Sequence, residues 1–211
     1  MKRVFGKICL AAILFIFPIA AFSQEDKETI EKTRKLVGEV IEKSFPELKQ
    51  TKIEIRTFRS ESNYFKSQFS VARFLTFQRL HYVIFVNPEV FRRSAPEDGI
   101  RAILAHELAH ILYYKRKNRF QLLGLTGLTD KSFTAKFERK ADLEAIARGW
   151  GEGLKAYRKW LYENIPPKEV NAKKRDYFSP EEIDLMLRIL REKPGMIDVW
   201  RKRVPRNIED L

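Results

Sequence analysis

The chain has 211 residues and a net charge of +13, from 41 Lys and Arg against 28 Asp and Glu. Its hydrophobic content of 44% excludes a disordered chain. The single cysteine, Cys9, excludes a disulfide scaffold and a thiolate zinc finger, so any metal site must use histidine and carboxylate ligands. The excess of basic residues favours an anionic partner, such as an envelope surface, without identifying it.

The first 23 residues have the layout of a secretory signal peptide. Basic side chains precede an uncharged apolar run over residues 8–22, and Ala21 and Ser23 are small residues suited to cleavage after Ser23. A spanning helix needs about 20 apolar residues, and Pro18 interrupts this run. We therefore expect an exported protein, periplasmic or secreted, with no transmembrane segment in its mature chain.

The remaining residues, 24–211, predict a single α+β domain with a small N-terminal sheet and a helical C-terminal half. No repeat or long linker divides them. The apolar spacing predicts an N-terminal amphipathic helix, a few strands and then mainly helices. In chain order these are a helix over 25–48 ending near Pro46, strands over 52–58, within 64–77 and over 82–86, helices over 97–117, 131–148, 154–163 and 179–192, and a loop over 118–130.

The predicted helix over 97–117 carries a polar group among apolar residues. His106 and His110 are four residues apart, so both lie on one face and can share a metal ion. Glu107 can lean toward the same ion and accept a proton from a water on it. A chance match is the alternative, but two of the three histidines of the chain fall in this pattern.

A catalytic zinc ion requires a third protein ligand and one open position. Glu138 and Asp142, on the next predicted helix, share a face and have apolar neighbours. Glu138 can bind the metal, and Asp142 can hold the free ring nitrogen of a ligating histidine. Two alternatives remain: His81 as third ligand, or ordinary solvated acids on an exposed helix face.

The pattern His106-Glu107-x-x-His110 followed by Glu138-x-x-Ala141-Asp142 resembles the gluzincin metallopeptidases. Over residues 82–150 it is most similar to the family of the CAAX prenyl proteases and HtpX-type proteases. The resemblance implies a zincin-like fold, zinc bound by His106, His110 and Glu138, and Glu107 as general base. It also implies a protein or peptide substrate that pairs with the strand over 82–86.

This chain departs from that family in three respects, of which one is the gap of 27 residues with a glycine-containing loop between His110 and Glu138. It has no transmembrane helices after the signal, and no histidine follows Glu138 to stabilise an oxyanion. The residue with that role is open among Tyr157, Arg148, Tyr114 and His81.

Two other functions remain open. One is a catalytically weak zincin-fold binding or chaperone-like module of the envelope, and the other is hydrolysis of a non-peptide amide. Nothing resembles a nucleic-acid-binding module. The aromatic residues Trp150, Tyr157, Trp160 and Tyr162 are interpreted as helix packing.

Overall fold

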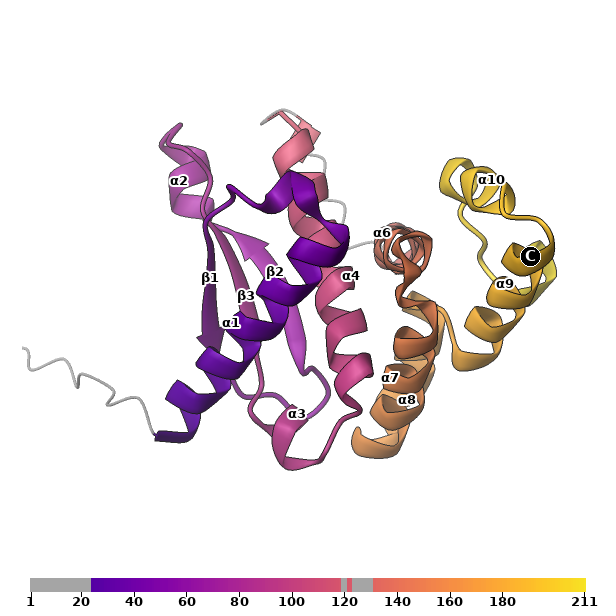
Figure 1. Cartoon of the computed structure of the whole chain (residues 1–211), viewed down its shortest axis with the longest axis horizontal. Helices are drawn as coiled ribbons and strands as arrows, with labels where there is room; N and C mark the ends of the chain where they lie inside the picture. The colour runs from indigo at the N-terminus through magenta and orange to yellow at the C-terminus, as the bar shows by residue number, and fades with distance from the viewer. Residues whose placement is uncertain (1–23, 119–120, 123–130) are drawn as a thin grey trace, which may run out of the picture.

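The computed structural model describes residues 24–118, 121–122 and 131–211 (Figure 1). It is mostly helical with one small sheet, which confirms the predicted α+β class. The signal peptide predicted over residues 1–23 lies outside the described residues, as does most of the loop predicted over 118–130. Of its described residues, Asn118 is not helical, whereas Gln121 and Leu122 are.

The sheet has three strands in the order β1-β3-β2. The central strand β3 pairs parallel with β1 and antiparallel with β2, and its Ile84 is fully buried. Alternate residues of this apolar run, Tyr82, Ile84 and Val86, belong to the hydrophobic core, and Val83 is buried between the two neighbouring strands. The strands predicted over 52–58 and 82–86 are confirmed, whereas residues 64–77 form one strand and a short helix. These elements are β1 (Ile53–Thr57), β2 (Phe65–Phe69), α2 (Val71–Leu75) and β3 (Tyr82–Val86).

Two long helices pack against the sheet and against each other. The first, α1 (Gln24–Ser44), contacts β1 and β3, and a short 3-10 turn, Pro46–Leu48, follows it. The second, α4 (Glu97–Arg116), contacts β2 on one side and the C-terminal helices on the other (Figure 1). Because α4 lies between these two layers, most of its residues are buried, including its polar ones.

The C-terminal half consists of helices that pack in succession beyond α4 (Figure 1). A π-helical turn, Ile146–Trp150, joins the first two of them. The aromatic side chains interpreted as helix packing are buried at Trp150, Tyr157 and Trp160, which confirms that interpretation. The helices are α3 (Glu89–Arg92), before α4, then α6 (Lys131–Ala145), α7 (Gly151–Asn164), α8 (Pro167–Asp176), α9 (Pro180–Glu192) and α10 (Met196–Lys202), with a final 3-10 turn, Ile208–Asp210.

The break between the helices predicted over 131–148 and 154–163 is shorter than expected. Only Gly149, at φ 86°, leaves the helical conformation, and α7 begins at Gly151. A Cβ atom at Gly153 would collide with the backbone oxygen of Asp98 in α4. This glycine therefore allows close packing of α7 on α4 and does not break the helix.

The start of α9 follows its prediction, whereas α8 was not predicted. Ser179 caps α9 by accepting a bond from the backbone N–H of Glu182, whose side chain bonds back to the Ser179 N–H. The helix predicted over 154–163 ends at Asn164, before the proline pair at 166–167, and Pro167 is then the first residue of α8. A proline suits that position because the first helical N–H needs no partner within the helix.

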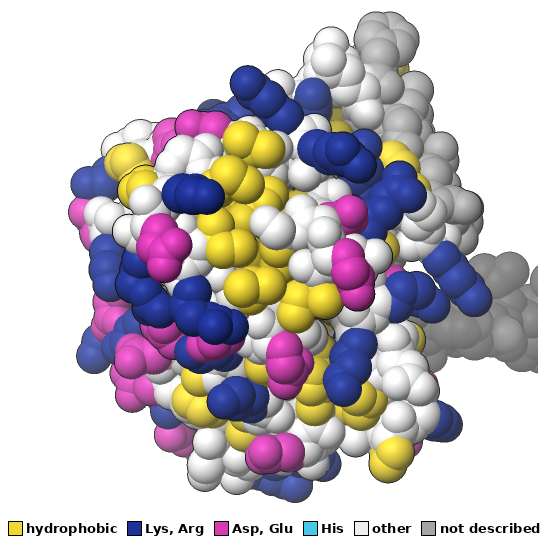
Figure 2. Space-filling view, turned by 90° about the vertical axis from the view of Figure 1, so that its right-hand side faces the viewer, with side chains coloured by type: hydrophobic (Ala, Val, Ile, Leu, Met, Phe, Trp, Pro, Cys, Tyr) yellow, Lys and Arg dark blue, Asp and Glu magenta, His cyan; other side chains and the backbone are white. Residues whose placement is uncertain are grey.

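Figure 2 turns the side of α9 and α10 toward the viewer. A band of hydrophobic side chains runs down this face, and both basic and acidic side chains border it. Among the helices that the structure describes, none is both long enough and apolar enough to cross a membrane.

Candidate metal centre

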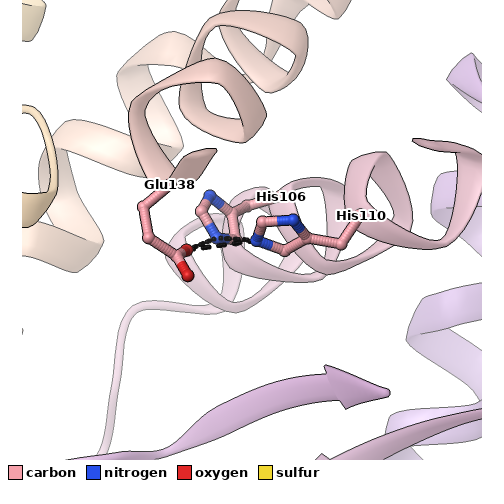
Figure 3. A group of neighbouring side chains, drawn as sticks. All are labelled: His106, His110 and Glu138. Atoms are coloured by element: carbon pink, nitrogen blue, oxygen red, sulfur yellow. Dashed lines mark hydrogen bonds and ion pairs between the residues drawn. The ribbon is translucent and has the colours of Figure 1, made fainter. Parts of the chain in front are cut away.

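The helix α4 brings the two predicted histidine ligands together. His106 and His110 lie one turn apart on the same face, with their Nε2 atoms 3.1 Å apart (Figure 3). Both are almost fully buried, at 1% and 5% exposure. Burial of two imidazoles side by side is costly unless their ring nitrogens find partners, so the interior here is built around a polar group.

The third member of the group comes from α6. Glu138 Oε2 lies 3.1 Å from the Nε2 atom of each histidine. Figure 3 shows the three side chains converging from two helices on one point. A zinc ion with bonds of about 2.0–2.1 Å at tetrahedral angles holds its ligand atoms roughly 3.3–3.4 Å apart. The triangle of donor atoms therefore fits a metal ion after a small expansion, as the sequence predicted.

Asp142, one turn further along α6, holds the other nitrogen of His106. Its Oδ1 accepts a 2.7 Å bond from Nδ1 of that ring, and the carboxylate is fully buried. A proton on Nδ1 leaves the lone pair of Nε2 free for a metal ion. The position predicted for Asp142 is thus the one observed.

The charges in this cluster change one another's pKa values. Burial opposes the charged form of His106, but the bonds to Asp142 and Glu138 outweigh it and raise the pKa of His106 to about 10. Burial would raise the pKa of Glu138, yet His110 and His106 hold it well below its ordinary value. A metal ion entering this site must therefore displace a tightly held proton.

Two further groups complete the surroundings of Asp142. Arg158 Nη2, from α7, donates a 2.9 Å bond to Oδ1, and the backbone N–H of Phe178 donates a 3.1 Å bond to Oδ2. Although burial opposes its charged form, Asp142 has a lowered pKa because Arg158 and His106 stabilise the carboxylate. The sequence did not predict a functional position for Arg158.

A groove of about 720 Å³ runs past this centre. The whole of β2 lines one side, and His110 and Glu138 line the other. Glu107, only 5% exposed, lines the same groove as His110 and Glu138. No residue of the segment 24–50 is among the described residues that line this groove.

The structure changes which strand borders the groove. The expectation that the strand over 82–86 pairs with a peptide is wrong, because β3 is central and both of its edges are already paired. Within the described residues β2 is an edge strand, and it lies along the groove. The irregular aromatic sequence of residues 64–77 concealed its position.

Of the four residues considered for oxyanion stabilisation, the structure places only some beside the groove. Neither Arg148 nor His81 lines the groove. Arg148 is instead paired with Glu47 and Glu144, and His81 contacts Glu54. The group that could hold a metal ion consists of His106, His110 and Glu138, so His81 is not its third member.

Tyr114 does line the groove, whereas Tyr157 lines a smaller hollow behind Glu107. Tyr177, which was not predicted, also lines the groove, and its ring centroid lies 5.8 Å from that of His106.

No family model, curated protein or solved structure matches this chain. The interpretation of the centre is therefore based on the sequence motif and the geometry alone.

Proposed function

We propose that the chain is an exported, zinc-dependent metallopeptidase of gluzincin type with a zincin-like fold, which hydrolyses peptide bonds in proteins or peptides. One observation carries the proposal. Two histidine nitrogens and one glutamate oxygen, all 3.1 Å apart, meet at a groove that also holds Glu107 and an edge strand.

His106, His110 and Glu138 would hold the ion, and their donor set of two imidazoles and one carboxylate is suited to zinc. Zinc bound there supplies a Lewis acid that polarises a carbonyl group and lowers the pKa of water. The protein fixes the ligands beforehand, because Asp142 and Arg158 hold the His106 ring in one tautomer and orientation.

Glu107 is proposed as the general base. It follows the ligand His106 on the same turn of α4 and lines the groove next to His110 and Glu138. Its carboxylate can accept the proton of an attacking water and then deliver it to the leaving amine. A proton transfer of this kind contributes typically 10²–10⁴-fold to the rate.

The free edge of β2 is proposed as the substrate-binding strand. An extended peptide can add to this edge through main-chain hydrogen bonds, which places its backbone along the groove. Phe65, Phe69 and Phe137 line the groove and would contact apolar substrate side chains.

Tyr114 and Tyr177 are proposed as donors to the developing oxyanion. Both line the groove, and burial raises the pKa of each phenol above its ordinary value. Each hydroxyl therefore stays protonated at neutral pH and can donate a hydrogen bond.

The experiment separates metal binding from hydrolysis with two variants of the full chain. Glu107→Gln should keep one zinc per chain, measured by mass spectrometry, and lose at least about a hundredfold of its activity on casein and peptides. Glu138→Ala should lose both zinc and activity. Glu97→Gln is the matched control, because Glu97 is exposed at the start of the same helix and should change neither.

Other results would favour the alternatives. Zinc bound without hydrolysis of any peptide would favour a binding module, whose activity Glu107→Gln should leave unchanged. Hydrolysis of cell-wall fragments but not of peptides would indicate a non-peptide amide substrate. Absence of zinc from the unaltered chain, even after zinc is supplied, would refute the enzyme.

A further inference from the structure

The connection between β2 and β3 forms a projecting tip. These strands are antiparallel neighbours, and Phe69 pairs with Tyr82, so a turn of two residues could join them. The chain instead runs from residue 70 to residue 81 and builds α2, which stands out beyond the sheet in Figure 1. A bond from the Ser70 N–H to the His81 carbonyl oxygen closes the base of this tip.

The tip separates anchoring and exposed apolar side chains. Phe74 and Leu80 pack against the core at its base, and the Phe74 ring lies 5.6 Å from that of Phe69. Leu75 and Phe77 are 66% and 82% exposed, and Phe77 is the most exposed large hydrophobic residue among those described. Exposure of two large apolar side chains is unfavourable in water and favourable at an apolar surface.

Phe77 also has an unusual backbone conformation. Its φ is 57°, in the left-handed region that large side chains seldom occupy. Hydrogen bonds on either side, from Thr76 N–H to Ala72 O and from Gln78 N–H to Arg73 O, hold this turn in place. The conformation therefore belongs to a formed turn that presents the ring outward.

Basic side chains surround a hollow at the base of the tip. This pocket, of about 390 Å³, is lined by Lys52, Arg73, Arg79 and Lys115, which are all exposed. No aspartate or glutamate is among the described residues that line it, and the nearby Glu54 is paired with Arg56 and His81. A concave site with cations of one sign suits phosphate groups.

We propose that this tip docks the protein on an anionic lipid bilayer. Leu75 and Phe77 enter the boundary between headgroups and acyl chains, and the basic pocket receives a lipid phosphate. Apolar side chains at a projecting end with cations behind them are the arrangement of a peripheral membrane contact. The apolar band in Figure 2 differs, because acidic and basic side chains border it together. This proposal does not depend on hydrolysis.

The test measures the polarity around a label on the tip. Binding of the whole chain to vesicles would not be specific, because the apolar run over residues 8–22 can bind lipid in its own right. In the full chain with Cys9→Ser, Leu75→Cys is labelled with an environment-sensitive NBD fluorophore. Vesicles of phosphatidylcholine with phosphatidylglycerol should shift its emission to the blue by roughly 10 nm, as expected for entry into the interface. Vesicles of phosphatidylcholine alone should not.

Two matched controls make the result specific. Val199→Cys, labelled in the same way on α10, is 53% exposed at the other end of the molecule and should not respond. Lys52→Glu with Arg79→Glu should weaken the response at least about tenfold, since each cation contributes to attraction by anionic lipid. Arg191→Glu with Lys193→Glu on the exposed end of α9 should leave it intact.

Three results would overturn the proposal. These are an equal shift with uncharged vesicles, an equal shift at position 199, or a full shift in the Lys52→Glu and Arg79→Glu variant. A shift at position 75 produced by double-stranded DNA but not by vesicles would assign the tip to nucleic acid.

Discussion

The metal centre and the α2 tip depart from ordinary folding preferences in opposite directions. At the centre, charged and polar side chains of α4, α6 and α7 are buried and paired with one another. At the tip, large apolar side chains are exposed, one of them on a left-handed residue. Each arrangement is costly if folding is the only requirement, so both regions indicate function.

Variants of the metal centre and variants of the α2 tip should affect stability differently. The charges of the centre stabilise one another, so a variant that disturbs them should lose stability and metal together. Leu75 and Phe77 are exposed and lie outside the core, so a variant at either position should lose the proposed membrane contact while the fold stays intact or improves.

The largest effect is expected from Asp142→Asn, which leaves Arg158 buried without its charged partner. Breaking such a pair typically costs about 3–5 kcal/mol, and loss of the bond to His106 should weaken metal binding about 10–100-fold. Chemical denaturation and competition with a chelator measure the two quantities.

Asp184→Asn is the matched control, because its pair with Lys155 lies at the surface, only partly buried, and should contribute less than about 1 kcal/mol. Equal destabilisation by both variants would contradict the importance of the buried pair. In the Asp142→Asn background, Arg158→Met should recover part of the lost stability by removing the unpaired charge.

The pH dependence of stability and of zinc affinity provides a second test of the centre. The raised pKa of His106 stabilises the protein without metal fully below about pH 6.5, and this contribution is lost as the pH rises through about 10. Zinc competes with the same proton, so its affinity should rise about tenfold per pH unit for each proton displaced. The increase in Tm on adding zinc should therefore grow from pH 6 to pH 9.

His81→Gln is the control for this measurement, because His81 contacts Glu54 outside the groove and should not change the trend. An increase in Tm that is constant with pH would contradict a proton held between the ligands.

The smallest effect is expected at the tip. Asparagine tolerates a left-handed backbone better than phenylalanine, so Phe77→Asn should raise the free energy of unfolding by about 0.5 kcal/mol. The same change should reduce the blue shift of a label at position 75. Phe77→Ala removes the ring but retains the backbone penalty, so it should be less stable than Phe77→Asn. If the asparagine variant were the less stable one, the tip would contribute to the fold.

Local spacing made much of the fold and the ligand group predictable. Residues four apart on one helix must share a face, which is why His106 with His110 and Glu138 with Asp142 could be paired from the sequence. The apolar run over 82–86 likewise predicted a buried strand, although not that it would be central.

The position of Arg158 depended on tertiary contacts, yet one signal was present. Residues 154, 158, 161 and 165 follow helical spacing, and Arg158 interrupts a stripe formed otherwise by Leu154, Leu161 and Ile165. An arginine within an apolar stripe requires a buried acid, and Asp142 supplies it. Tyr177 gave no comparable signal, because it lies between helices where no periodicity applies.

Asp142 also sets an order of events for a newly made chain. It is bonded by groups at positions 106, 158 and 178, so the carboxylate joins segments far apart in the sequence. A chain that emerges N-terminus first presents all three metal ligands before Arg158 and Phe178 follow. Until then Asp142 lacks two of its three partners, so the proposed ligands would hold an ion less tightly. If this group binds the proposed zinc ion, tight uptake would therefore belong to the last stage of maturation, after residue 178 has emerged.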